Sequence, residues 1–480
     1  MTHVAAAKPA REWLDAEAQG RLERRLEAAL RRARGSGVTV AVSLSAKLVR
    51  PVDPTAVVAA SRRPGEHWFC FEEPERDGWA LAALGCLCAI EARGANRFAQ
   101  VGLRWRRFAA GALADTPDGP SGVGLVALGG FAFAPDGGSS ASWEGFAPAS
   151  LVVPDISLSR KSGQVWLTVN AQVAPDDTIA DALNAVERRL GELREVPLPL
   201  LDPSPTGAYR VLSPMAPSHF EEAVSRATER IRGGELEKIV LAREVEVHAP
   251  VEHEPGAILG LLREAFGSCY VFAVGRADAT FLAASPELLV RRDGQRASTV
   301  ALAGSARRSA DPAVDDHLGE QLMRSDKDRE ENAIVARRIA RTLRAHSVWV
   351  TAAPEPVIVR IANIQHLAAP IRAQLASSIG AIELAGLLHP TPAVGGEPAA
   401  LVAKLIPALE GLDRGWYAGP VGWTDASGDG EFCVALRCAL LRGRLARCYA
   451  GCGIVHDSDP AAELAESEVK LEALLPLLAG

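Results

Sequence analysis

Apolar and polar positions along the first part of the chain predict a β-rich segment. Short apolar runs such as GVTVAVSL, GLVALGGFAFAP, SLVVPDISLSR and QVWLTVNAQV lie between residues 37 and 175, separated by Gly, Pro and Ser clusters. This spacing is typical of strands joined by turns. Residues 12–34 and 178–194 instead carry apolar positions at helical spacing. The proline-rich stretch near 196–207 is the predicted junction, so we expect an N-terminal segment, 1–205, packed on a catalytic part, 206–480.

The second part alternates helices with groups of strands. A helix is predicted over 217–232, and the strand KIVLAREVEV follows from Lys238. In ELLVRRDGQRASTVAL the pair Asp293-Gly294 is a hairpin turn signal, and residues 315–345 have a strongly helical pattern. Near the end, PVGWTD, EFCVALRCALL and RLARCYAGCGIV are predicted to form an antiparallel meander. Strands paired mostly by hairpins, with helices between them, predict an α+β fold rather than a doubly wound parallel sheet.

Composition narrows the classes of function. The chain has 480 residues, 48% of them apolar, and a net charge of −7 without a long basic run, which argues against a nucleic-acid partner. No segment approaches the roughly 18 uninterrupted apolar residues of a membrane span, and the first residues lack a signal-peptide core. We therefore expect a cytoplasmic globular protein. The eight cysteines lack metal-type spacing and are predicted to be buried free thiols.

Two predicted helices carry acidic side chains at positions i and i+3, which places both on one face. The pairs are Asp328 with Glu331, and Glu463 with Glu466. Such a face suits Mg²⁺, which prefers oxygen ligands and needs only one or two carboxylates. Charged helix faces are also common on solvated surfaces, so the spacing by itself leaves both interpretations open.

Three further residues raise a question about chemistry. Arg437 lies inside the apolar run EFCVALRCALL, where a guanidinium needs an anion, either a core carboxylate or a substrate carboxylate. Lys238 begins an apolar strand and is either an edge-strand charge or a base. Glu287 follows a Ser-Pro pair and is either a turn carboxylate or an acid. The local pattern leaves each pair of alternatives open.

Taken in order, several motifs resemble the chorismate-utilising enzyme family. They cover roughly residues 215–475, and their number and order make chance agreement negligible. The N-terminal part, with GGFAF, Trp143 and SLVVPDISL, is similar to the lead segment of isochorismate synthases. The motifs read EKIVLAR, FLAASPELL, ALAGSARR, SDKDREEN, IQHL, LLHPTPAVGG, GPVGW, VALRCA and AGCGIVHDSDPAAELAESEVK.

The resemblance implies an anthranilate synthase component I-like fold, with two facing, mostly antiparallel sheets surrounded by helices and one Mg²⁺ between them. Glu331 and Glu466 match the direct metal ligands, while Asp328 and Glu463 match positions that hold metal-bound water. Arg437 and Tyr417 match residues that grip the enolpyruvyl carboxylate of chorismate, and His366 matches one that lines the ring pocket. The full set of implied substrate-binding residues is Gly304, Ser305, His366, Ala393, Tyr417, Leu436, Arg437, Gly451, Gly453 and Lys470.

Individual positions separate the members of this family. Lys238 stands where amine-transferring members often have glutamine, which favours water as the nucleophile and predicts no glutaminase subunit. Ala303 replaces the nucleophilic lysine of aminodeoxychorismate synthases. Ala393 is typical of isochorismate synthases, whereas Tyr417 and Leu436 are more similar to salicylate synthases. Salicylate synthesis, in which isochorismate formation is followed by loss of pyruvate, therefore stays as the alternative.

The resemblance implies a reaction in which water adds at C2 of chorismate and the C4 hydroxyl leaves. Lys238 would have to be neutral to accept a proton from water, and Glu287 would have to be protonated to release the hydroxyl. A non-catalytic chorismate-binding subunit would lack one of the catalytic groups. Lys238, Glu287, Arg437 and the metal-site acids are all present in this sequence. Asn332 replaces a histidine that is frequent in the motif DREEN, which changes the expected local hydrogen bonding but leaves Glu331 in place. We expect a monomer.

Overall fold

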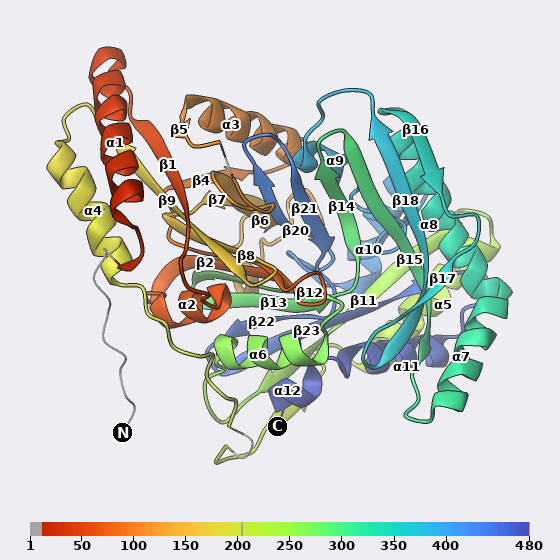
Figure 1. Ribbon diagram of the computed structural model, residues 1–480. Coiled ribbons are helices and arrows are strands. Elements are labelled where there is room, and N and C mark those ends of the chain that lie inside the picture. The colour runs from red at the N-terminus through yellow and green to blue at the C-terminus, as the bar shows by residue number, and fades with distance from the viewer. Residues whose placement is uncertain (1–11, 117, 203–204, 480) are drawn as a thin grey trace.

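The computed structural model describes residues 12–116, 118–202 and 205–479 and contains two large sheets with helices around them (Figure 1). One sheet has 13 strands and the other has 10. Within the described residues, the pairing of β1 with β5 is the single parallel one. This arrangement confirms the α+β prediction.

The 13-stranded sheet divides into two blocks by sequence. Strands from the second half of the chain form one side, and strands from the first half continue from β12 to the opposite edge. In order across the sheet the strands are β10 (Arg210–Leu212), β11 (Lys238–His248), β23 (Leu445–Ile454), β22 (Cys438–Arg442), β13 (Ala279–Ser285), β12 (Tyr270–Ala277), β2 (Gly65–Glu73), β3 (Trp79–Leu84), β8 (Ile156–Lys161), β9 (Gln164–Val173), β1 (Val40–Lys47) and β5 (Leu113–Ala114), with β19 (Gly396–Glu397) paired to β11.

The 10-stranded sheet is divided in the same way, with the N-terminal strands joined at β20. Its order is β16 (Ser347–Ala352), β18 (Ile364–Leu375), β15 (Arg296–Arg307), β14 (Leu288–Asp293), β21 (Gly430–Val434), β20 (Pro420–Asp425), β6 (Val126–Phe131), β7 (Ala149–Val153) and β4 (Cys88–Ala92), with β17 (Val357–Arg360) paired to β18. Each half of the chain thus contributes a contiguous block to both sheets. The division at residue 205 stays a prediction.

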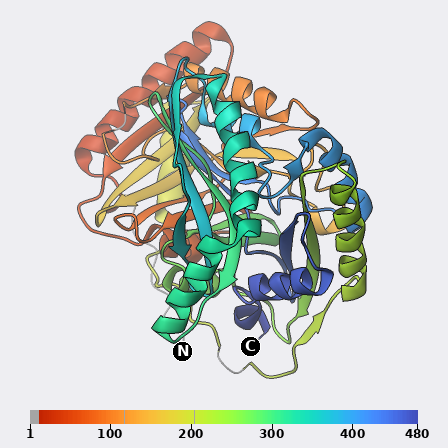
Figure 2. The same cartoon turned by 90° about the vertical axis from the view of Figure 1, so that its right-hand side faces the viewer.

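Helices cover the outer faces of the sheets. Figure 2 shows α7 and α8 along one side of the 10-stranded sheet, and α8 packs against β15 and β18. Within the described part of the chain, no helix has both the length and the apolar character of a membrane span. The helices are α1 (Ala16–Ser36), α2 (Pro54–Ser61), α3 (Arg97–Gly111), α4 (Ile179–Gly191), α5 (Pro217–Arg232), α6 (Pro255–Ala265), α7 (Pro312–Arg324), α8 (Asp326–Arg344), α9 (Ala381–Leu388), α10 (Ala399–Glu410), α11 (Pro460–Leu471) and α12 (Leu475–Ala479), with a 3₁₀ turn at Ala141–Trp143.

The chain crosses between the two sheets at two segments that matter for the site. Between β13 and β14 it crosses at Pro286 and Glu287, and between β21 and β22 it crosses at 435–437. The prediction that EFCVALRCALL is one strand of a meander is therefore wrong. Arg437 has a φ of 47°, a left-handed conformation that does not continue a strand. Both crossings place a polar side chain between the sheets.

Other elements agree with or depart from the sequence pattern for identifiable reasons. The strand at Gln164–Val173 and the helix at Pro217–Arg232 match their predicted bounds. The predicted helix over 315–345 is two helices, because Ser325 ends α7 and caps α8. Helices α2 and α3 interrupt the segment that was predicted to be β-rich. All eight cysteines are free, but Cys86 is exposed and Cys88 is half-buried, which corrects the prediction of uniformly buried thiols.

Candidate active site

One cavity between the sheets gathers most of the predicted site. All ten predicted substrate-binding residues line it, together with Glu287, Glu331 and Glu466. They come from strands of both sheets, from the two crossing segments, from helices α8 and α11 and, for Ala393 and Tyr417, from the loops that precede β19 and β20. Lys238, Asp328 and Glu463 do not line the cavity directly, but they touch or interact with residues that do.

Arg437 presents unused hydrogen-bond donors in this cavity. Its side chain is buried, and its Nη2 lies 2.6 Å from His366 Nε2. The Nε and Nη1 atoms are buried without a hydrogen-bond partner among the described residues. Because a buried guanidinium needs its donors satisfied, this geometry suits a ligand carboxylate. Among the described residues no carboxylate forms an ion pair or hydrogen bond with Arg437, although Glu287 lies near enough to interact with its charge.

His366 serves as a neutral acceptor for Arg437. Burial, together with the charges of Arg437 and Lys470, holds the pKa of His366 well below its usual value. Its Nδ1 lies 3.3 Å from the carbonyl oxygen of Gly304, so we assign the proton to Nδ1. The unprotonated Nε2 then accepts from Arg437. The imidazole thus links the arginine to the Gly304 backbone.

Glu287 is a buried carboxyl with an altered pKa. It is 3% exposed, and burial raises its pKa to about 8 despite the nearby charges of Lys238, Arg437 and Lys470. The group is therefore largely protonated at neutral pH. This protonation state is the one that a proton donor in the cavity requires.

Lys238 is held beside Glu331 at the edge of the cavity. The lysine is fully buried at the start of β11, and its Nζ lies 2.8 Å from Glu331 Oε1. Glycine at position 453 makes this contact possible, because a Cβ there would overlap Glu331 Oε1 and lie 2.9 Å from Lys238 Cε. Lys238 is thus not a solvated edge charge.

The four predicted metal-site acids gather where two helices face one another. Ser325 caps α8 and Asp459 caps α11, which places Asp328 and Glu463 in the respective first turns. Glu331 and Glu466 follow one turn later in each helix, because residues three apart share a face. Burial and the charges of Glu331 and Glu466 raise the pKa of Asp328. The acids therefore interact electrostatically.

Hydrogen bonds hold Glu463 and Glu466 in place. Glu466 Oε1 accepts from Ser305 Oγ at 2.7 Å and lies 2.8 Å from Lys470 Nζ. Burial alone would raise the pKa of Glu466, but these partners lower it. Glu463 Oε1 accepts from Ser458 Oγ at 2.7 Å, whereas its Oε2 is buried with no hydrogen-bond partner among the described residues.

This set of donors fits a hard divalent cation. Glu463 is buried with one unsatisfied carboxylate oxygen, and the other three acids are half-buried. Mg²⁺, which prefers oxygen ligands, would neutralise these carboxylates. Two neighbours were missed from the sequence. Lys327 lies 2.9 Å from Glu463, and the thiol of Cys452 lies within 4.8 Å of ligand oxygens of Glu463 and Glu466. The motifs SDKDREEN and AGCGIV contain them, but spacing does not show that their side chains turn toward the acids.

Comparisons with known proteins match the chain to one family. The sequence profile of the chorismate binding enzyme family matches residues 27–479. A salicylate biosynthesis isochorismate synthase from Pseudomonas aeruginosa is 37% identical over 437 residues, covering 90% of this chain and 89% of that protein. The structure of MenF, the menaquinone-specific isochorismate synthase from Escherichia coli, is similar with a TM-score of 0.75 and 28% identity, covering 94% of this chain and 99% of that one.

A more distant structure confirms the predicted fold. Anthranilate synthase component I from Streptococcus pneumoniae has a TM-score of 0.58 at 21% identity, covering 72% of this chain and 79% of that one, which is a likeness of fold alone. Together with the match along nearly the whole sequence, these findings show that the chain belongs to the chorismate binding enzyme family.

Proposed function

We propose that the protein is a Mg²⁺-dependent isochorismate synthase that adds water at C2 of chorismate and releases the C4 hydroxyl. The observation that carries the proposal is that a buried acid with a raised pKa, Glu287, lines the cavity, while a buried lysine, Lys238, lies against the lining residue Glu331. Relatives that are named isochorismate synthases support the same reaction.

Binding of chorismate requires partners for its two carboxylates. The free donors of Arg437 suit the enolpyruvyl carboxylate, with Tyr417 beside it in the cavity. Gly304, Ser305, Gly453 and Lys470 form the part of the wall next to the carboxylate cluster. We assign the ring carboxylate to this side, because backbone N–H groups and the ammonium can approach it there.

The reaction conserves atoms by an exchange of protons. Lys238 in its neutral form accepts a proton from the water that bonds to C2, the ring double bonds shift, and Glu287 gives its proton to the departing C4 hydroxyl. Solvent then returns a proton from Lys238 to Glu287. The contact of Lys238 Nζ with Glu331 Oε1 at 2.8 Å would have to open for Nζ to face this water.

The carboxylates define where the metal would bind. Glu331 and Glu466 would be its direct ligands, and Asp328 and Glu463 would hold its water. When bound, Mg²⁺ would orient and neutralise the ring carboxylate. We further propose that the enzyme works without a glutaminase subunit, because Lys238 favours water over ammonia.

Salicylate synthesis is the second candidate. Tyr417 and Leu436, which are more typical of salicylate synthases, both line the cavity, although Ala393 lies there as well. The two functions differ in whether pyruvate is lost after water addition.

Product analysis separates the candidates. Purified protein is incubated with chorismate and MgCl₂, and the products are identified by chromatography, with an EDTA-treated sample as the control. Isochorismate without pyruvate is the expected result. Salicylate with an equal amount of pyruvate would replace the proposal by the second candidate, and absence of turnover would reject both in favour of a non-catalytic subunit.

A further inference from the structure

The wall of the cavity contains a β-bulge at Ala303 and Gly304. Strands β15 and β18 pair regularly up to Leu302 opposite Ala368, and pairing resumes with Ser305 opposite His366. Two residues therefore face Leu367 alone, and Gly304 has a φ of 80°. A bulge interrupts the hydrogen bonds of the ladder and turns the following side chain. The bulge thus determines how Ser305 meets Glu466.

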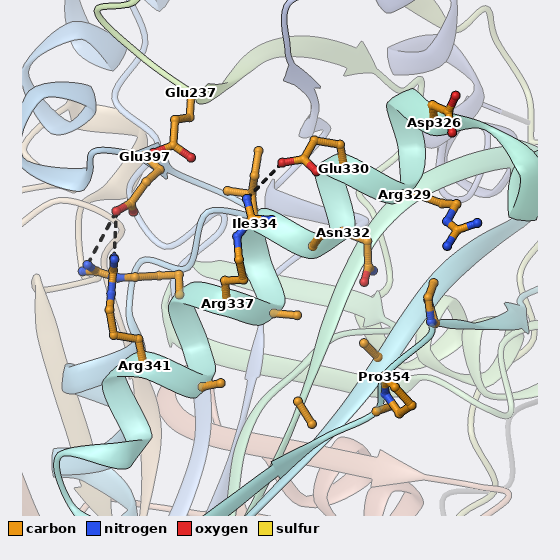
Figure 3. A pocket seen from close by; sticks show the side chains of 18 of the residues that line it. Glu237, Asp326, Arg329, Glu330, Asn332, Ile334, Arg337, Arg341, Pro354 and Glu397 are labelled. Atoms are coloured by element: carbon orange, nitrogen blue, oxygen red, sulfur yellow. Dashed lines mark hydrogen bonds and ion pairs between the residues drawn. The ribbon is translucent and has the colours of Figure 1, made fainter.

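One side chain on helix α8 forms hydrogen bonds with the backbone at this bulge. Asn332 on α8 is 2% exposed, and its Nδ2 donates to the carbonyl oxygens of Leu367 at 2.9 Å, Ala301 at 3.1 Å and Ala303 at 3.3 Å. An amide has two N–H groups, so the three carbonyls share them. Figure 3 shows Asn332 on α8, where the neighbouring Glu330 is paired with Arg337.

Asn332 lies next to three parts of the site. Glu331 precedes it on α8, the bulge contains Gly304 and leads into Ser305, and Leu367 directly follows His366, which contacts Arg437. Ser305 in turn donates to Glu466. One amide therefore fixes the distance between α8 and the two strands that carry these groups.

We propose that Asn332 is a positioning residue for chorismate, whose amide locks the Ala303–Gly304 bulge so that Ser305, His366 and Glu331 face the same cavity. The inference rests on the proposed function for the identity of the ligand. Asn332 itself touches neither the substrate nor the reacting atoms.

The test uses an isosteric substitution and a matched control. Asn332→Asp keeps the shape of the side chain but replaces the donor by an oxygen that repels the three carbonyls. Asn332→His keeps one ring N–H donor. Gln365→Ala is the control. Gln365, on β18, is a buried amide like Asn332, and its Nε2 donates to the backbone carbonyl of Asp315 on α7 at 3.2 Å. Unlike the residues near the bulge, it does not line the cavity.

We expect Asn332→Asp to raise the KM for chorismate about tenfold with a smaller change in kcat, and Asn332→His to recover most of that loss. Gln365→Ala should lower the melting temperature by a similar amount and leave KM unchanged. An unchanged KM in Asn332→Asp, or an equal rise in Gln365→Ala, would overturn the proposal.

A second measurement separates this inference from the proposed function. The rise in melting temperature on adding chorismate and MgCl₂ needs no turnover, and it should be smaller in Asn332→Asp than in the wild type. A wild-type protein that is stabilised by chorismate but forms no isochorismate would contradict the proposed function alone. Equal stabilisation of wild type and Asn332→Asp would contradict the positioning role alone.

Discussion

Glu287 gives the most direct prediction at the scale of single residues. Its pKa of about 8 makes it a proton donor at neutral pH, so kcat should fall as the pH rises above about 8 and the carboxyl ionises. Glu287→Gln cannot donate a proton and should lose at least about 100-fold in kcat. A pH–rate profile of both proteins checks this, and a wild-type profile that stays flat up to pH 10 would remove Glu287 as the acid.

The same carboxyl should also influence stability. Because its pKa is raised above the usual 4.5, it contributes stability that is complete below pH 4.5 and is lost as the pH rises through about 8. The amide of Glu287→Gln does not ionise. The melting temperature of the variant should therefore depend less on pH between about 5 and 9 than that of the wild type.

Lys238 should be required for water addition but not for substrate binding. Its Nζ is buried against Glu331, whereas the free donors for a carboxylate belong to Arg437. We expect Lys238→Ala to lose about 100-fold or more in turnover while chorismate still raises its melting temperature. Turnover at the wild-type rate would exclude the base assignment.

Sequence reasoning predicted which residues lie around one cavity better than it predicted their contacts. Arg437 was expected to need an anion, and the structure places it against neutral His366 with two donors free. The hydrogen bonds of Asn332 were not predictable, because they depend on a bulge in a different segment. Sequence motifs predict which residues lie near the cavity, but the pairing register of the strands determines which atoms each side chain contacts.

At the scale of elements, the acidic residues in the first turns of α8 and α11 are predicted to determine the affinity for Mg²⁺. Glu466→Gln removes one charge from the cluster and should weaken apparent Mg²⁺ affinity about tenfold or more, measured by magnesium titration of activity and by calorimetry. Glu468→Gln is the matched control, since Glu468 lies on the same helix with a side chain that is 61% exposed. An unchanged titration for Glu466→Gln would remove it from the proposed ligands.

Predicted elements failed where a single residue interrupts an apolar or helical run. Hydrophobicity continues through EFCVALRCALL, so its pattern does not reveal that the chain leaves one sheet for the other at Arg437. Ser325 similarly separates two helices whose combined pattern is continuous. In both cases tertiary pairing outweighs local periodicity, and both interruptions lie beside predicted site residues.

At the scale of the whole molecule, the N-terminal strands continue the sheets of the catalytic part. The seams are the pairs β2–β12 and β6–β20. Phe71 and Tyr270 lie across the β2–β12 seam with their ring centroids 5.5 Å apart. Trp79 on β3 lies 6.0 Å from Trp423 on β20, in the other sheet. Trp143 stacks on Tyr449 at 5.8 Å, and Tyr449 lines the cavity. The first half of the chain thus supports the wall of the site.

This continuity predicts that the full chain unfolds as one cooperative unit. Separating 1–205 from 206–480 would expose the strand edges at β12 and β20 and the aromatic contacts between the blocks, which costs more than a loose domain interface. We expect calorimetry to show a single transition, and Trp143→Ala to lower the stability of the whole chain by about 3–5 kcal/mol. Phe108→Ala on α3, where the ring is only partly buried, is the control and should cost less. Two resolved transitions, with only the first shifted by Trp143→Ala, would instead mean that the segments fold independently and that the cavity wall does not need the N-terminal block.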